Sequence, residues 1–473
     1  MKNKLEKLKV IFRDKLTLYP IFTGILFLVN ELRNNAIFYT LQESVSLILI
    51  ILAFVFVADL LSRKLIKDKT KAALIATLFI IINLFYQDIF LAITRQRLLV
   101  SFDNLTNVKH SEVVIIPIVL VTWLIFTFFI LRTKRILAGI NLYLNILIII
   151  FVLVEIVQWA IIPVPQIQLA DNKPFPVNVK LLPEQKPDIY YIILDSYTSS
   201  ESLKKYWKYD NSVFEDSLKH LGFQIDSKSK SDYASTPYCL ASYLNSSTLL
   251  MDTTKYHYNE RNLLQLIRKN HLYNWLNANN YHCNNLSIFD AFGSNKYYNF
   301  FTYNHILGRT IWFVNYVKLH NYFNNKKFGY ISETNLKLFN DINKQVEEKH
   351  DQPTFTYAHV MMPHTPYTFN EYGKPYKATD TMTNKQKYLG QLIYTSSLAL
   401  KTINHILKSS RRMPIIVIQG DHGFRFLVDT TMIEKSREAH TIFYAIYSPY
   451  GSIRTDNINP SITFRKVIEK INN

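Results

Sequence analysis

Long apolar runs are confined to the first third of this 473-residue chain, and they constrain its fold more than any other feature. A helix needs about 20 apolar residues to cross the hydrocarbon core of a bilayer. Five runs of roughly this length cover residues 16–36, 45–62, 72–93, 113–131 and 137–162. No small-residue cleavage site follows the first run, so we do not expect a cleavable signal peptide. The sequence predicts an N-terminal bundle of five transmembrane helices over residues 1–162.

Basic residues are distributed unequally between the two sides of this predicted bundle. Fourteen Lys and Arg residues lie before the first run and in the loops after the second and fourth. Only four, Arg33, Arg95, Arg97 and Lys109, lie in the other two loops. The side richer in Lys and Arg normally faces the cytoplasm. We therefore expect a cytoplasmic N-terminus and, after five crossings, a C-terminal domain outside the cytoplasm.

The remainder of the chain has the mixed composition of a water-soluble domain. Residues 163–187 contain six prolines and predict a semi-extended connector. From residue 188 onward, short apolar runs alternate with helical patterns. The predicted strands are 189–194, 354–360, 414–418 and 441–447, and the predicted helices are 208–221, 261–278 and 386–408. Continuous apolar strands separated by helices indicate a mostly parallel sheet covered on both faces, an α/β/α sandwich over residues 188–473.

Charge and cysteine content add weaker constraints. The formal net charge of +18 suits an anionic lipid surface or a phosphate-bearing substrate, although it could equally serve solubility. We expect no nucleic-acid partner, because no recognition motif is present and the chain begins in the predicted membrane bundle. Cys239 and Cys283 could form one disulfide or stay as two thiols, and their spacing excludes a C-x-x-C site.

Two predicted strands are followed by residues of the kind that bind metal ions. Asp195 follows the run at 189–194, and Asp421-His422 follows the run at 414–418. Ligands collect beyond the carboxyl ends of the strands in open α/β sheets. Carboxylate and imidazole ligands from neighbouring strands suit a divalent cation, although an Asp after a strand also commonly caps a helix. The sequence predicts a metal site formed by these three residues.

Thr236 is the candidate nucleophile. It precedes Pro237, a residue favoured at the first position of a helix, so Thr236 is predicted to occupy the cap position. The hydroxyl could simply cap that helix. The same helix N-terminus would also stabilise a threonine alkoxide and an incoming phosphate. His359 and His364, after the strand at 354–360, suit contact with phosphate oxygens or a second metal.

These segments resemble the alkaline phosphatase superfamily in order and in character. Three motifs carry the resemblance: Thr236 with a helix ending in Ser242-Tyr243-Leu244-Asn245, the loop Pro363-His364-Thr365-Pro366-Tyr367-Thr368-Phe369 with Gly373 downstream, and Asp421-His422-Gly423. Within the superfamily, the chain is similar to membrane proteins with a sulfatase domain, the lipoteichoic acid synthases and phosphoethanolamine transferases. Two positions depart from that pattern. Asp195 stands where such transferases commonly have Glu, and His440 lacks the His-Gly pattern.

The resemblance implies a role for each of these residues. Thr236 would be the nucleophile that is transiently phosphorylated. Asp195, Thr236, Asp421 and His422 would hold one divalent metal (Mn, Mg or Zn), with a second possible. His359, His364 and, by its placement before the last strand, His440 would contact the substrate phosphate. Sulfatase activity itself is not expected, because Thr236 cannot become formylglycine and Leu240 stands where the signature arginine would be.

The function that follows is transfer of phosphoglycerol or phosphoethanolamine from a membrane lipid to an envelope glycan or lipid. The resemblance places the protein in the bacterial cytoplasmic (inner) membrane as a multi-pass protein, with its catalytic domain outside the cytoplasm. One alternative is a membrane-anchored phosphodiesterase or phosphatase, in which water replaces the acceptor. A second is a catalytically inert scaffold for envelope assembly, which the intact Thr236 and Asp421 argue against.

Overall fold

The computed structural model describes residues 16–35, 41–86, 88–89, 92, 111–134, 137–161, 167–176, 185–250, 260–293, 330–377, 381–427, 430–453 and 459–472. The described residues divide into two compact units, one before residue 163 and one after it. The predicted boundary between residues 162 and 163 lies outside the described residues.

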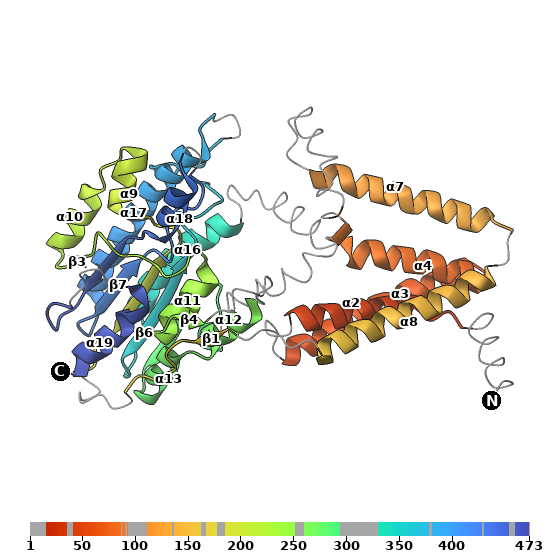
Figure 1. Ribbon diagram of the computed structural model, residues 1–473, viewed down its shortest axis with the longest axis horizontal. Coiled ribbons are helices and arrows are strands. Elements are labelled where there is room, and N and C mark those ends of the chain that lie inside the picture. The colour runs from red at the N-terminus through yellow and green to blue at the C-terminus, as the bar shows by residue number, and fades with distance from the viewer. Residues whose placement is uncertain are drawn as a thin grey trace. The chain divides into compact units, whose positions relative to one another are not determined.

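The N-terminal unit is helical and follows the apolar runs closely. Its helices are α2 (Tyr19–Asn35), α3 (Leu41–Leu65), α4 (Lys69–Leu84), α7 (Ser111–Arg132) and α8 (Ala138–Ile161) (Figure 1). Helix α2 packs against α3, α4 and α8. Phe27, Ile51, Val55 and Ile80 belong to the buried core of this unit.

Two described helical segments, Ser44–Leu65 and Ala138–Ile161, are long and apolar enough to cross a membrane. Large apolar side chains on α3, α7 and α8 face outward, among them Phe56 with 61% and Phe129 with 65% exposed area. Water would oppose so large an exposed apolar surface, whereas lipid chains accommodate it. These features indicate a membrane protein.

The C-terminal unit is built on a six-stranded sheet of order β3-β8-β7-β2-β6-β5. Its strands are β2 (Ile189–Leu194), β3 (Gln224–Ile225), β5 (His282–Leu286), β6 (Thr354–Val360), β7 (Ile415–Gln419) and β8 (Tyr444–Tyr447). The neighbours β7-β2-β6-β5 are parallel, whereas β8 pairs antiparallel with both β7 and β3. The sheet is therefore mixed, with a parallel centre.

The antiparallel strand β8 is the exception among the four strands of the sheet that the sequence predicts to be mostly parallel. A parallel connection must carry the chain back to the opposite end of the sheet. Here the chain stays at the carboxyl end of β7, because Gln419 pairs with Tyr444 and the Gly420 amide donates to the Phe443 carbonyl at 2.9 Å. The intervening helix α18 (Met432–His440) leads into β8 at that same end.

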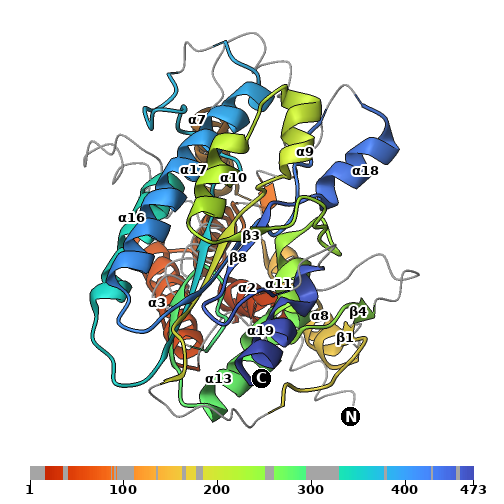
Figure 2. The ribbon, with the colours of Figure 1, turned by 90° about the vertical axis from the view of Figure 1, so that its left-hand side faces the viewer.

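Side chains on the central strands alternate between two cores, one on each face of the sheet. Tyr191 and Ile193 belong to one core, whereas Ile192 and Leu194 belong to the other. The first core is covered by α11 (Thr236–Asn245), α12 (Glu260–Arg268), α13 (His271–Ala278) and α19 (Thr463–Asn472). The second is covered by η3 (Leu203–Trp207), α10 (Ser212–His220), α16 (Tyr330–Glu347) and α17 (Asn384–Ser409). The short helix α9 (Ser200–Ser202) runs directly into η3. The two views show this layering, which is the predicted α/β/α sandwich (Figures 1 and 2).

Two local predictions differ from the structure. The helix predicted over 261–278 is divided into α12 and α13, because the Asn270 side chain accepts from the Tyr273 amide and starts a new helix. The segment at 163–187 does more than connect. Within its described part, β1 (Gln168–Leu169) pairs antiparallel with β4 (Leu249–Leu250), and Phe175 is buried in the core. This pairing could not be predicted from the sequence alone, because Leu169 pairs with Leu249, which lies 80 residues further along the chain.

Both cysteines are free thiols. The Cys239 thiol donates to the Tyr233 carbonyl at 3.1 Å, and its burial raises its pKa well above the ordinary value. Burial also raises the pKa of Cys283 to about 12. Neither is therefore an activated thiol.

Candidate active site

The three residues that the sequence predicts as metal ligands meet at the carboxyl ends of β2 and β7. These two strands are parallel neighbours, with Ile193 opposite Gln419, so the residues that follow them emerge together. Asp195, Asp421 and His422 are all buried, and they offer ligand atoms within 4.8 Å of one another. His422 Nε2 lies 3.6 Å from Asp421 Oδ2 and 3.8 Å from Asp195 Oδ1. This is the one group of three such residues that could hold a metal ion within the described ranges.

The two oxygens of Asp421 have different surroundings. Oδ1 accepts hydrogen bonds from the backbone amides of Ser196 at 2.9 Å and His422 at 2.8 Å. Oδ2 is buried and has no hydrogen-bond partner among the described residues. A buried carboxylate oxygen without a partner is costly, and a cation would compensate it. The residues present therefore fit a divalent cation.

The ring of His422 is held with one nitrogen turned toward the carboxylates. Its Nδ1 lies 2.9 Å from the Gly423 carbonyl, which can only accept, so Nδ1 carries the proton. Nε2 is then the nitrogen turned toward the carboxylates, and in the neutral ring it has the free lone pair that a metal ligand requires. The turn also needs glycine at 423, because a Cβ there would collide with the Glu438 and Thr441 carbonyl oxygens. The Asp-His-Gly order thus has a steric basis.

Asp195 is oriented by His359, which lies on the neighbouring strand β6. His359 Nε2 is 3.3 Å from Asp195 Oδ2, and His359 Nδ1 is 3.1 Å from the Tyr357 hydroxyl. Burial alone raises the pKa of Asp195, but the hydrogen bond and charge of His359, with smaller effects of His364 and His422, hold it below its usual value. Asp195 is therefore an ionised carboxylate at neutral pH.

Ser196, between the strand and this site, adopts a left-handed backbone conformation with φ of 63°. Such a conformation is uncommon for a residue with a side chain and tends to occur at functional sites. Here it allows the Ser196 amide to reach Asp421 Oδ1. The Tyr388 hydroxyl, donating to the Ser196 carbonyl at 2.7 Å, supports it.

Thr236 lies at the first residue of α11 and not at the cap, where the sequence placed it. The cap position belongs to Ser235, whose extended backbone has φ of −143°, and no side chain caps this helix. The Thr236 hydroxyl oxygen instead lies 3.4 Å from His422 Nε2. Thr236 therefore does not act as the cap of this helix.

The other predicted histidines occupy different surroundings. His359 is fully buried behind Asp195, with both ring nitrogens in contact with protein groups. His364 is nearer the surface, with its ring centre 6.4 Å from that of His422. His440 Nδ1 lies 2.8 Å from the Ser231 carbonyl. No described contact joins His440 to Asp195, Asp421 or His422.

Sequence reasoning missed Arg425, which is exposed beside this group. Its guanidinium donates to the Ala234 carbonyl at 3.2 Å and lies 3.2 Å from His364 Nε2. His364 Nδ1 is 2.7 Å from the Thr365 carbonyl, so Nδ1 is protonated and Nε2 accepts from Arg425. Arg425 thus bridges the loop before Thr236 and the loop of His364. In the sequence, its position two residues after Gly423 was the feature that could have marked Arg425 as a site residue.

The fold and this group define an α/β/α protein with a candidate metal site, Asp195, Asp421 and His422, and the Thr236 hydroxyl beside it. A family model described as Sulfatase matches residues 199–452, more than half of the chain. The chain therefore belongs to the sulfatase family, within the alkaline phosphatase superfamily. No curated protein matches the chain.

Several solved structures are similar to the chain at low identity. The integral membrane lipooligosaccharide phosphoethanolamine transferase A (EptA) of Neisseria meningitidis is 11% identical, with 94% of this chain and 78% of that chain covered and a TM-score of 0.41. The C-terminal periplasmic domain of Escherichia coli EcEptC in complex with Zn is 12% identical, with 60% and 76% covered and a TM-score of 0.36. The Listeria monocytogenes lipoteichoic acid synthase LtaP is 15% identical, with 60% and 71% covered and a TM-score of 0.36.

Proposed function

We propose that this protein is a membrane phosphotransferase in which Thr236 is the nucleophile. The observation that carries the proposal is the 3.4 Å approach of the Thr236 hydroxyl to His422 Nε2, beside a buried Asp421 oxygen that has no partner. The group transferred would be a phosphate-linked headgroup, phosphoglycerol or phosphoethanolamine, taken from a membrane lipid. The acceptor would be an envelope glycan or lipid.

Asp195, Asp421, His422 and the Thr236 hydroxyl would together hold one divalent cation. Such a cation lowers the pKa of a hydroxyl group and polarises a phosphate oxygen. The mixed carboxylate and imidazole set favours Zn or Mn over Mg, which prefers oxygen ligands. In this assignment His359 does not contact the phosphate. It orients Asp195 and keeps that carboxylate ionised.

The chain's own residues would then carry the transfer in two stages. Thr236 Oγ1 attacks the phosphorus and gives up its hydroxyl proton, the bond from phosphorus to the lipid alcohol breaks, and the alcohol leaves with one proton. An acceptor hydroxyl then attacks the phosphothreonine and gives up its proton, the bond from phosphorus to Thr236 breaks, and Thr236 Oγ1 regains a proton. Arg425 supplies a cation at the mouth of this site, and its guanidinium can exchange His364 for a phosphate oxygen. The N-terminus of α11 favours negative charge at Thr236.

We propose that the five N-terminal helices all span the membrane and that the catalytic domain lies outside the cytoplasm. The unequal distribution of basic residues and the outward-facing apolar side chains support this arrangement. It would give Thr236 access to lipid headgroups of the outer leaflet.

The test is to trap the intermediate on Thr236. The purified chain, incubated with a lipid donor and quenched in acid, should carry phosphate or phosphoalkyl mass on the peptide spanning residues 231–255. Thr236→Ala should remain folded and bind metal but lose the label and turnover, since removal of a nucleophile costs orders of magnitude in rate. Thr236→Ser should retain part of the activity. Label on another residue, or full activity in Thr236→Ala, would refute the mechanism.

A hydrolase of the same family predicts the same label but a different fate. Water would remove the group at a rate independent of any acceptor. If the protein is a transferase, candidate glycan or lipid acceptors should speed loss of the label. An inert scaffold would take no label at all.

A further inference from the structure

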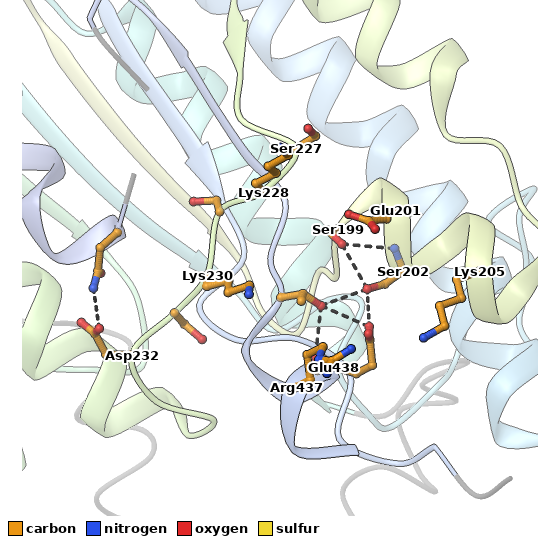
Figure 3. A pocket seen from close by; sticks show the side chains of 14 residues that line it. Ser199, Glu201, Ser202, Lys205, Ser227, Lys228, Lys230, Asp232, Arg437 and Glu438 are labelled. Atoms are coloured by element: carbon orange, nitrogen blue, oxygen red, sulfur yellow. Dashed lines mark hydrogen bonds between the residues drawn. The ribbon is translucent and has the colours of Figure 1, made fainter. Parts of the chain in front are cut away.

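We propose that a second cavity, lined by hydroxyl groups, four cations and the three carboxylates Glu201, Asp232 and Glu438, binds a phosphorylated sugar unit of the glycan acceptor. Its walls come from the start of α9, from residues 227–232 and from the end of α18 (Figure 3). Its volume is about 570 Å³, within the range of roughly 300–1,000 Å³ typical of small-ligand sites. A cavity of this size is far larger than one phosphate group needs. This assignment deepens the proposed function and rests on it for the identity of the acceptor.

The cations of this cavity include side chains that the protein does not neutralise. Lys228, Lys230 and Arg437 line it, and none of them forms an ion pair with any described residue. They are exposed and come from two separate elements. A fourth, Lys205, is paired with Glu434 at 3.2 Å. Unpaired lysine and arginine around one hollow are the usual means of binding a phosphate group.

The floor of the cavity contains a buried carboxylate and the hydroxyl groups that bind it. Glu438 is 5% exposed, and its Oε2 accepts hydrogen bonds from the hydroxyls of Ser202 and Thr441. Its Oε1 has no hydrogen-bond partner among the described residues, and no described cation pairs with it. Figure 3 shows Lys205, Lys230 and Arg437 lying around Ser202 and Glu438. A carboxylate oxygen and several serine hydroxyls can exchange hydrogen bonds with sugar hydroxyls.

Segments of the cavity wall are adjacent in sequence to residues of the candidate active site. Ser199 lies four residues after Asp195, and Asp232 lies four residues before Thr236. The end of α18 packs directly on the turn after His422, where the Gly423 amide donates to the Ala439 carbonyl at 2.9 Å. A glycan held here would therefore have its neighbouring units close to Thr236. A free phosphate would use the cations but leave most of the volume and the hydroxyl groups without a role.

Binding can be measured apart from turnover. The full-length Thr236→Ala chain, in detergent micelles, is titrated with glucose 6-phosphate and with glucosamine 6-phosphate and followed by ³¹P NMR. We expect at least one of them to bind more tightly than inorganic phosphate, and added glucose, which has no ³¹P signal of its own, to displace it only weakly. Adding Lys230→Gln and Arg437→Gln together should weaken binding by at least about tenfold, the loss expected when charge-assisted hydrogen bonds to phosphate are removed.

Two control variants identify the site. Lys435→Gln removes the same charge from α18 at a residue that does not line the cavity, and it should leave binding unchanged. Arg425→Gln alters the candidate active site and should also leave binding unchanged. Binding lost in Arg425→Gln but kept in the double variant would place the ligand at the active site and overturn the proposal. So would no binding by either sugar phosphate, or inorganic phosphate binding as tightly as the sugars.

A kinetic measurement on the wild-type Thr236 background completes the test. The double variant should raise the KM for the acceptor while kcat and the KM for the lipid donor stay near the wild-type values. An unchanged acceptor KM would also overturn the assignment. If Thr236→Ala keeps full activity, the proposed mechanism fails, while the NMR titration still decides whether this cavity binds phosphorylated sugars.

Discussion

Asp421→Asn should change stability in opposite directions with and without metal. In the metal-free chain, Asp421 Oδ1 accepts two backbone hydrogen bonds, whereas Oδ2 is buried without a partner. The asparagine oxygen can keep both backbone hydrogen bonds. Its uncharged amide removes a buried negative charge whose second oxygen has no hydrogen-bond partner among the described residues. The variant should therefore be more stable than wild type when no metal is bound.

The magnitudes follow from the same surroundings. Relieving a buried unsatisfied charged group should stabilise the metal-free chain by about 1–3 kcal/mol. Removing one partner of a buried charge pair costs about 3–5 kcal/mol, so metal affinity should fall by roughly two to three and a half orders of magnitude. Metal that binds only the folded state raises its stability. Added metal should therefore raise the free energy of unfolding of the wild type, and should raise that of the Asp421→Asn variant much less.

The assay is thermal unfolding of the chelator-treated chain, with and without added Zn or Mn, together with metal content after dialysis. Asp188→Asn is a matched control, because Asp188 is also buried but accepts from the Thr354 amide at 2.7 Å and lies 3.9 Å from Arg412. That variant should gain the same metal-induced stability as wild type and should bind metal normally. Destabilisation of the metal-free Asp421→Asn chain, or an equal metal-induced shift in it and in wild type, would refute the assignment.

Three further outcomes are expected. Arg425→Gln should lower kcat/KM for the donor by about 10- to 100-fold, the loss of one charge-assisted phosphate contact, with metal content unchanged; reduced metal content would instead make Arg425 structural. The low pKa of Asp195 keeps that carboxylate ionised down to acid pH, and its stabilising contribution is lost only as the pH falls through the depressed value. In His359→Ala, burial would act without the opposing histidine, so the pKa of Asp195 should rise. As the pH is lowered, this variant should therefore release metal at a higher pH than wild type does. An unchanged pH midpoint of metal release would contradict the orienting role of His359. A reporter active only outside the cytoplasm, fused after residue 473, should be active, and activity of a cytoplasm-only reporter there would reverse the proposed topology.

The sequence predicted the elements whose signal is local. The strands at 189–194 and 354–360 have the bounds that were predicted, because a fully buried central strand must be apolar at every position. The apolar runs coincide with α2, α3, α4, α7 and α8 for a similar reason, since such runs are long and uninterrupted. The metal-type residues could be predicted to meet because the carboxyl ends of neighbouring parallel strands share one edge.

Features that depend on distant partners were not predictable. The sequence of β8 is as apolar as that of β2, so nothing local distinguishes its antiparallel direction, which α18 imposes by keeping the chain at one end of the sheet. Likewise, β1 looked like part of a connector because its pairing partner β4 lies far along the chain.

The candidate site divides in the same way. Residue type and order by themselves marked Asp195, Thr236, Asp421 and His422, because carboxylate, imidazole and hydroxyl groups after strands or before a helix already indicate their chemistry. Only the tertiary structure placed His359 behind Asp195 and Arg425 beside His364, and only it left one Asp421 oxygen without a partner. These features are distances between side chains on separate strands and loops. They are set by packing, so a linear sequence does not contain them in readable form.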